Sequence, residues 1–442
     1  MKWLLKYLFV VLIIVVMGSC AREEASKPKP IPEKPHSYTI MCYACCGGLD
    51  FDFDQMLEQM ESLDIPKHIN VVGQVKWTKG YYEHFDGRGG VSRFVYHHGY
   101  DENRFTEFAQ SNYRVDEPQN IAEFISWAQA KAPADEYILV LFGHGNAYNP
   151  HSDAMTRGTL YDEYYKSYTS VGDIAEALCL ADAPLSLVYM VSCMMNAMEY
   201  LSELAPYTEY TLASSHVSFT TFAELQLLVD GLMQYGQNGE DAIPQSVEYA
   251  ISEEFRLHYV EEIYVSDKML MDSSHMAEIN AEIRGFVDIV SALYDEQEQI
   301  GEAAMFEKYQ FTTSDIDAAL VSSYDFLEVF IESYYASSWY SSMYNRDLVD
   351  VVCRVASATQ YAPLIESSER VCNVAEKAVV HRVSSFVQGV DGVYPSVTLV
   401  NGDEWIELGF DEADYEALAF DKATGWSKLL KVNKANFKHA SK

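Results

Sequence analysis

Basic side chains are scarce in this 442-residue chain, which has 31 lysines and arginines against 66 aspartates and glutamates and a formal net charge of -35. Binding to a phosphate backbone requires a positively charged surface, so the composition argues against a nucleic-acid partner. Disorder is also disfavoured, because 49% of the residues are hydrophobic and 13% are aromatic. The composition is typical of a packed globular protein with a solvated acidic surface.

Long apolar runs are scarce, and the one that suggests a membrane or export signal lies at the N-terminus. There Lys2 and Lys6 precede the apolar segment Leu8–Met17, which is followed by two small residues and Cys20. This segment is shorter than the roughly 20 residues that a bilayer-spanning helix needs, and its flanks are those of a signal peptide. Residues 1–19 are therefore predicted to be a leader.

Cys20 stands in a segment that resembles a bacterial lipoprotein processing site, in which it becomes the lipidated first residue. An uncleaved N-terminal anchor is the alternative. Residues 20–35 are polar and proline-rich and are predicted to form an extended tether. Glu23 and Glu24 resemble the acidic export tag of surface lipoproteins in Bacteroidota. We expect an exported chain anchored to the bacterial outer membrane, at the cell surface or on the periplasmic face.

Cysteine is infrequent, with eight in the chain, and seven remain if Cys20 is lipidated. In an exported protein an odd number leaves one thiol without an internal disulfide partner. Cys42, Cys45 and Cys46 lie close together in sequence, but no second Cys or His pair at zinc spacing accompanies them. Packing or disulfide formation is their expected role, and no metal site is predicted.

Strands alternate with helices over residues 36–231, which predicts an α/β fold with a mainly parallel sheet. Nearly continuous apolar runs such as Tyr137–Phe142 are typical of strands covered on both faces. Beyond them the pattern shifts to longer helical stretches such as Ala277–Tyr294, with late strands near the end. The predicted division is a catalytic domain at 36–231 and a largely helical C-terminal region at 232–442.

The individual elements are predicted from hydrophobic periodicity and from turn residues. The predicted strands are Tyr38–Cys45, Ile69–Trp77, Ser92–His97 (an edge strand), Tyr137–Phe142, Leu185–Val191 and Thr208–Ala213. The predicted helices are Asp54–Leu63, Gly172–Leu180 and Met194–Leu204. A further helix is predicted to start at Asp116 and Pro118. His151–Ser170 is predicted to be a long polar loop.

Two neighbouring strands of this set end in residues that are suited to nucleophilic chemistry. One runs into His144 and the next along the chain into Cys193, with a loop and a single helix between them. A right-handed crossover of this kind brings both residues to the same edge of a parallel sheet. A thiol needs a nearby base to form the thiolate, and His144 can supply one. On the residues alone, a packed cysteine and a histidine in a turn remain alternatives.

Two backbone features are expected to assist this pair. The helix predicted to follow Cys193 would favour the thiolate through its N-terminal amides. Gly145 has no side chain, so its N–H can approach a substrate carbonyl and form an oxyanion hole together with the N–H of Cys193.

The segments around the two strand ends, YILVLFGHG and LVYMVSCMM, resemble the signature strands of the clostripain-like cysteine peptidases, in the caspase, gingipain and legumain group. The similarity runs from about Tyr38 to Leu430 and includes FDKATGWSKLL near the end. It implies a caspase-like sandwich, with His144 as the general base and Cys193 as the nucleophile. It also implies cleavage of peptide bonds through an acyl-enzyme, with no cofactor required.

The chain departs from this family where the substrate pocket is expected. Many relatives carry Asp-Ala directly before the Cys, and the Asp helps to bind Arg or Lys; here the pair is Val191-Ser192. Further pocket residues are expected at Ser214, Ser215 and His216, none of which is acidic, and a structural role for His216 is an equal alternative. Specificity for basic residues is therefore not predicted, and a medium-polar or apolar pocket and a loss of activity are the alternatives to it.

Two features bear on maturation and on calcium. Some relatives mature by cleavage between the His and the Cys, and Arg157 lies in the matching loop. Asp50, Asp52 and Asp54 alternate in a way that suits calcium, with which clostripain is associated, but acidic residues at a helix N-terminus explain the run better.

The predicted function is therefore an exported, lipid-anchored cysteine endopeptidase that acts on peptides or proteins. The alternative is a catalytically silent caspase-like lipoprotein that acts as a binding module. The preferred substrate and the oligomeric state do not follow from the sequence.

Overall fold

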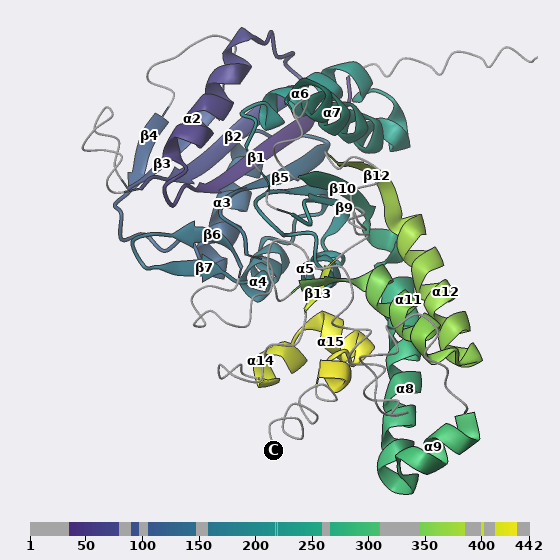
Figure 1. The fold of residues 1–442 in the computed structure, drawn as a ribbon. Coiled ribbons are helices and arrows are strands. Elements are labelled where there is room, and N and C mark those ends of the chain that lie inside the picture. The colour runs from purple at the N-terminus through teal and green to yellow at the C-terminus, as the bar shows by residue number, and fades with distance from the viewer. Residues whose placement is uncertain are drawn as a thin grey trace, which may run out of the picture. The chain divides into compact units, whose positions relative to one another are not determined.

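A sheet of nine strands forms the centre of the described part of the chain (Figure 1). The structure, a computed structural model, describes residues 35–78, 90–96, 105–146, 158–216, 218, 220–258, 266–309, 345–384, 399–401 and 412–430. The strands of the sheet are β1 (Tyr38–Cys45), β2 (Ile69–Lys76), β3 (Val91–Tyr96), β4 (Phe105–Ala109), β5 (Glu136–Gly143), β8 (Leu185–Val191), β9 (Thr208–Ala213), β10 (Asp267–Asp272) and β12 (Val379–Ser384). In space they follow the order β12-β10-β9-β8-β5-β1-β2-β3-β4.

The five central strands β9, β8, β5, β1 and β2 run parallel to one another. Two strands are added antiparallel on each side, β3 and β4 beyond β2 and β10 and β12 beyond β9. The predicted α/β fold with a mainly parallel sheet is confirmed. The order reverses at β1, because β2 lies on one side of it and β5 on the other. Ligands of open α/β sheets bind at such a switch point, outside the carboxyl ends of the strands.

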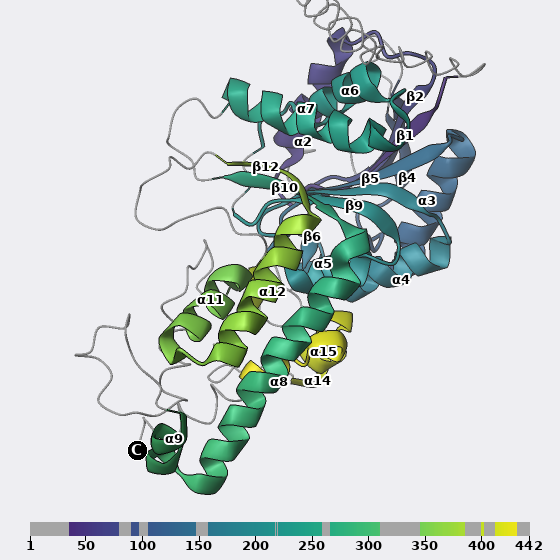
Figure 2. The ribbon, with the colours of Figure 1, turned by 90° about the vertical axis from the view of Figure 1, so that its right-hand side faces the viewer.

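Helices cover both faces of the sheet (Figure 2). They are α2 (Asp50–Gln59), α6 (Glu224–Tyr235) and α7 (Ala242–His258) on one face, and α3 (Pro118–Lys131), α4 (Val171–Ala181) and α5 (Met198–Leu204) on the other. Successive side chains of β1 point to opposite faces of the sheet and enter two hydrophobic cores. Ile40 and Cys42 lie in one core, and Met41 and Tyr43 lie in the other. All four side chains are fully buried, which explains why the strand is apolar throughout.

The C-terminal part is largely helical, and its helices extend away from the sheet (Figure 2). Its helices are α8 (Met276–Ile300), α9 (Glu302–Tyr309), α11 (Leu348–Thr359), α12 (Ala362–Ala378), α14 (Glu412–Glu416) and α15 (Ala419–Thr424). Two small antiparallel pairs complete the described elements, namely β6 (Thr159–Asp162) with β7 (Ser167–Thr169), and β11 (Asn345–Asp347) with β13 (Leu399–Asn401). Short 3-10 turns lie at Met60–Ser62, Gly239–Asp241 and Ser273–His275.

Three local predictions were wrong. The strand predicted at an edge is β3, which β4 covers on its outer side; the sequence FTEFA of β4 is too short and polar to be recognised as a strand. The described part of the predicted loop His151–Ser170 contains the hairpin β6–β7. The helix expected from Met194 begins only at Met198, because Met194 has a positive φ of 57° and turns the chain.

The sheet extends past residue 231, since β10 and β12 come from the later part of the chain. The described residues from Ser37 onward form one compact unit. The predicted leader, Cys20 and nearly all of the tether lie outside the described residues, as does Arg157. Within the described ranges no helix is both long and apolar enough to span a bilayer.

Candidate active site

The register of two strands brings His144 and Cys193 to one edge of the sheet. Strand β5 pairs in parallel with β8, and Phe142 lies opposite Val191. His144 comes two residues after Phe142, and Cys193 comes two residues after Val191. Because hydrogen-bonded strands lie about 4.8 Å apart, the two residues leave the sheet next to each other, at the carboxyl ends of β5 and β8.

Gly143 lets the chain leave β5 at this point. Its φ is 156°, and a Cβ there would lie 2.6 Å from the carbonyl oxygen of Cys45 on β1. A side chain at this position would therefore push β5 away from β1 just before His144.

The imidazole of His144 is half-buried and is oriented by the loop that follows β1. Its Nε2 lies 3.2 Å from the carbonyl oxygen of Gly47. A carbonyl only accepts, so Nε2 carries the hydrogen of this bond and Nδ1 is left with the lone pair in the neutral ring. The ring of Tyr161 on β6 packs edge-on, with the ring centroids 6.2 Å apart. These contacts hold the ring in one orientation and one tautomer.

The thiol of Cys193 is half-buried, and its Sγ lies 3.8 Å from the carbonyl oxygen of Ser218. Burial raises the pKa of Cys193. The hydrogen bond to Ser218 and a local backbone hydrogen bond lower the pKa, but they offset the effect of burial only in part. The predicted stabilisation of the thiolate by a following helix is wrong, since α5 starts five residues later, at Met198. Helix-terminal effects fall off within one turn.

Gly145 packs directly against the Cys193 turn. A Cβ on Gly145 would lie 2.4 Å from the Cys193 carbonyl oxygen and 2.8 Å from the Ser192 Cβ, so only glycine fits. Gly145 forms an isolated antiparallel bridge with Thr159. The hydrogen bonds of that bridge come from the N–H groups of Asn146 and Leu160, so the bridge does not use the N–H of Gly145.

The five predicted pocket residues are all buried, which limits what their side chains can offer to a substrate. Their exposed fractions are Val191 4%, Ser192 2%, Ser214 1%, Ser215 0% and His216 2%. Ser192 Oγ is 2.9 Å from Thr159 Oγ1 on β6. The side chains of these five residues are therefore almost closed to solvent, and the hydroxyls of Ser192 and Ser214 are hydrogen-bonded within the protein.

The loop after β9 is held by Asp267, a residue that the sequence analysis missed. Asp267 Oδ1 accepts hydrogen bonds from Ser214 Oγ at 2.9 Å and from the N–H groups of Ser215 and His216 at 3.0 Å. His216 Nδ1 is also 3.0 Å from this oxygen. The carbonyl of His216 in turn accepts from the N–H of Met194, the residue after Cys193. His216 therefore connects Asp267 to the turn that carries Cys193.

A second buried polar cluster lies on the α6–α7 face of the sheet. Lys268 Nζ donates to both carboxylate oxygens of Glu254, at 2.6 and 2.7 Å, and to the hydroxyl of Tyr189 at 2.6 Å. Thr221 links this cluster to Glu224, since its Oγ1 donates to Glu254 and its N–H to Glu224 Oε1. Burial raises the pKa of Glu224. Lys268 lies in β10, beyond residue 231, and β10 was not among the predicted strands.

The acidic residues Asp50, Asp52 and Asp54 lie at the N-terminal end of α2, and Asp50 and Asp52 are in its first turn. Asp50 is buried, and its Oδ1 accepts from the N–H of Thr78 at 2.7 Å. Burial raises the pKa of Asp52, and His144 opposes that rise. The described ranges contain no group of three or more His, Cys, Asp or Glu side chains that could hold a metal ion.

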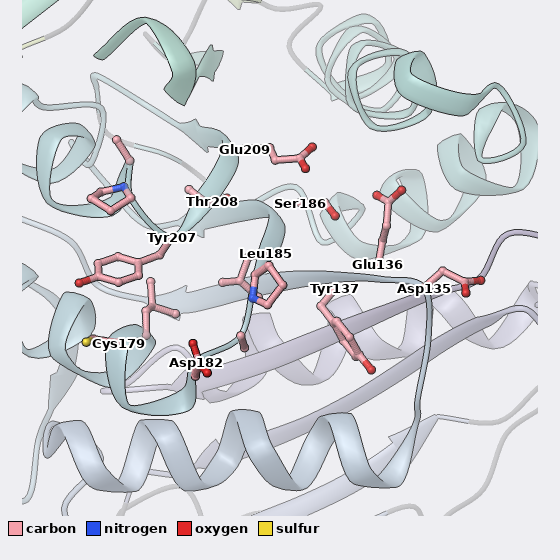
Figure 3. A pocket seen from close by; sticks show the side chains of 15 residues that line it. Asp135, Glu136, Tyr137, Cys179, Asp182, Leu185, Ser186, Tyr207, Thr208 and Glu209 are labelled. Atoms are coloured by element: carbon pink, nitrogen blue, oxygen red, sulfur yellow. The ribbon is translucent and has the colours of Figure 1, made fainter. Parts of the chain in front are cut away.

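A separate cavity of about 660 Å³ opens at the opposite edge of the sheet, at the amino ends of β5, β8 and β9 (Figure 3). Its polar lining includes Asp135, Glu136, Asp182, Tyr207 and Glu209. His144 and Cys193 lie at the other ends of these strands, so the cavity takes no part in their chemistry.

Comparison with solved structures identifies the fold as that of the C11 cysteine proteases. A secreted C11 cysteine protease from Bacteroides thetaiotaomicron, in complex with an irreversible peptide inhibitor, has a TM-score of 0.58 and 14% identity, covering 88% of this chain and 99% of that chain. An inactive zymogen C11 protease from Parabacteroides distasonis has a TM-score of 0.56 and 15% identity, with the same coverage. At these identities the likeness is one of fold.

The sequence itself defines the family. The Clostripain family profile matches residues 90–432, more than half of the chain, so the protein belongs to the Clostripain family of cysteine peptidases. A comparison with curated proteins gave no match.

Proposed function

We propose that the chain is an exported cysteine endopeptidase in which Cys193 is the nucleophile and His144 the general base. The main support is the register of β5 and β8, in which both residues follow the opposed pair Phe142 and Val191 by two positions. Membership of a cysteine peptidase family agrees with this assignment.

In the proposed reaction Cys193 Sγ attacks the scissile carbonyl carbon while its proton passes to His144. Nδ1 is the receiving nitrogen, because Nε2–H donates to the carbonyl of Gly47. The N–H groups of Gly145 and Cys193 stabilise the oxyanion of the tetrahedral intermediate. His144 then returns the proton to the leaving amine, and water hydrolyses the thioester. The raised pKa of Cys193 favours proton transfer during attack over a preformed thiolate.

The proposed substrate is a peptide or protein whose side chain before the cut is apolar or moderately polar. Val191 and Ser192 supply no carboxylate, and the loop residues Ser214–His216 are buried and bonded to Asp267. One similar structure is described as a secreted protease and holds a peptide inhibitor. It supports a peptide substrate and export. Cys20 is the proposed lipid anchor, and Arg157 a proposed maturation site.

The test is cleavage of a peptide library by the purified chain and by two cysteine variants. Cys193→Ala should abolish iodoacetamide-sensitive cleavage, whereas Cys179→Ala, which removes an exposed thiol on α4, should leave it unchanged. His144→Ala should reduce cleavage by at least about a hundredfold. Undiminished cleavage by Cys193→Ala would refute the assignment.

A catalytically silent binding module is the second candidate. The raised pKa of Cys193 and the absence of an acid at Val191 and Ser192 favour it. A thiol-reactive peptide probe separates the two functions, since selective labelling of Cys193 over the other cysteines requires an activated thiol.

A further inference from the structure

Two thiols of the C-terminal region lie in contact, far from the candidate active site in the chain. Cys353 is on α11 and Cys372 on α12, two helices that lie side by side in both ribbon views (Figures 1 and 2). Their sulfur atoms are 3.1 Å apart. Cys353 is exposed and Cys372 half-buried, so reagents can reach the pair from solvent.

We propose that Cys353 and Cys372 form a disulfide that joins α11 to α12 in the exported protein. A disulfide has an S–S distance of about 2.05 Å, so the sulfurs need to approach by only about 1 Å, which small side-chain rotations provide. Export exposes the chain to an oxidising compartment, where such bonds persist. The pair accounts for two of the seven cysteines other than Cys20 and leaves Cys193 as a thiol. The inference rests on the proposed export of the chain but not on the catalytic roles proposed for Cys193 and His144.

The pair is also chemically asymmetric. The hydrogen bond with Cys372 lowers the pKa of Cys353, while the pKa of Cys372 is raised, first of all by the same contact. Cys353 is also the more exposed of the two thiols, so a reagent in solution reaches it first.

The oxidant is a small-molecule disulfide or a thiol oxidase that carries one. With glutathione disulfide, the Cys353 thiolate attacks one sulfur, forms a mixed disulfide and releases one glutathione thiolate. Cys372 loses its proton and attacks Cys353 Sγ, which expels the second glutathione. In total two protein thiols are oxidised to one disulfide, and one glutathione disulfide is reduced to two molecules of glutathione.

The experiment incubates the full chain with glutathione disulfide, alkylates it with iodoacetamide under denaturing conditions without reductant, and digests it with trypsin. Cleavage after Arg346, Arg354, Arg370 and Lys377 yields the peptides DLVDVVCR and VCNVAEK, each with one cysteine. The expected product is these two peptides joined, two hydrogens lighter than their sum. Cys353→Ser should abolish it and leave VCNVAEK alkylated. Cys179→Ser, the control on α4, should leave the cross-link intact.

Thermal unfolding provides a second measurement. Reductant should lower the unfolding midpoint of the oxidised chain by a few degrees, because it breaks the cross-link between α11 and α12. The unfolding midpoint of the double variant Cys353→Ser/Cys372→Ser should not change on addition of reductant. Recovery of both peptides fully alkylated, or of Cys353 as a stable glutathione adduct, would overturn the proposal. Since neither measurement uses peptidase activity, an inactive enzyme would leave this result unaffected.

Discussion

The contact between Gly145 and Cys193 makes the substitution Gly145→Ala a sharp test of the site geometry. The added Cβ would lie 2.4 Å from the Cys193 carbonyl oxygen and 2.9 Å from the Met195 Sδ. Since Cβ atoms essentially never approach closer than 3.0 Å, the Cys193 carbonyl has to move by at least 0.6 Å (3.0 − 2.4). The thioether of Met195 can adapt, but a backbone carbonyl next to the nucleophile cannot move alone.

A misplacement of about 1 Å at a reacting group costs roughly a hundredfold in rate, so we expect kcat/KM to fall about 10- to 100-fold. This loss equals about 1.4 to 2.7 kcal/mol of transition-state stabilisation. Overpacking should also lower the free energy of unfolding by about 1 to 3 kcal/mol. The assay compares kcat/KM on the best library peptide, the rate of Cys193 alkylation and the thermal unfolding midpoint.

Gly285→Ala is the matched control, because a Cβ at that position of α8 has no neighbour closer than 4.0 Å. It should retain full activity and gain about 0.4 to 1 kcal/mol of stability from the smaller entropy of the unfolded chain. If Gly145→Ala keeps both the wild-type kcat/KM and the wild-type unfolding midpoint, then Gly145 does not pack against Cys193 and the proposed oxyanion hole is wrong.

Three further predictions follow from buried ionisable groups. Because burial raises the pKa of Cys193, its alkylation rate should keep rising through and above the ordinary thiol range; a plateau near neutral pH would instead indicate a preformed ion pair. Burial also raises the pKa of Glu224 above its ordinary 4.5, so its contribution to stability is present below pH 4.5 and is lost as pH rises through the folded-state pKa. Glu224→Gln should therefore flatten that decline in urea unfolding at a series of pH values, and an unchanged slope would contradict the argument. Lys268→Met leaves Glu254 buried without its cation and should lower the free energy of unfolding by about 3 to 5 kcal/mol. In urea unfolding, the double variant Lys268→Met/Glu254→Gln should recover most of the lost free energy of unfolding. Equal losses in the single and double variants would count against the ion pair of Lys268 and Glu254.

Hydrophobic pattern predicted much of the sheet. Strands β1, β8 and β9 have the predicted bounds. Strands β1 and β8 are buried along their whole length, which gives each of them a nearly continuous apolar run. Strand β4 has no such signature, since three of its five residues are exposed. Strand β10 also went unrecognised, because two of its six residues, Asp267 and Lys268, are buried charges.

The sequence by itself determined the α/β class, the position of His144 and Cys193 at two strand ends and, through the motifs around them, the family. These properties are local, since they depend on runs of apolar residues and on the residue that follows each run. Only the tertiary structure decided which residues distant in sequence contact the site around His144 and Cys193. Gly47 orients His144 across 97 positions, and Asp267 holds His216 across 51. Such partners depend on the order and register of the strands, which no local pattern encodes.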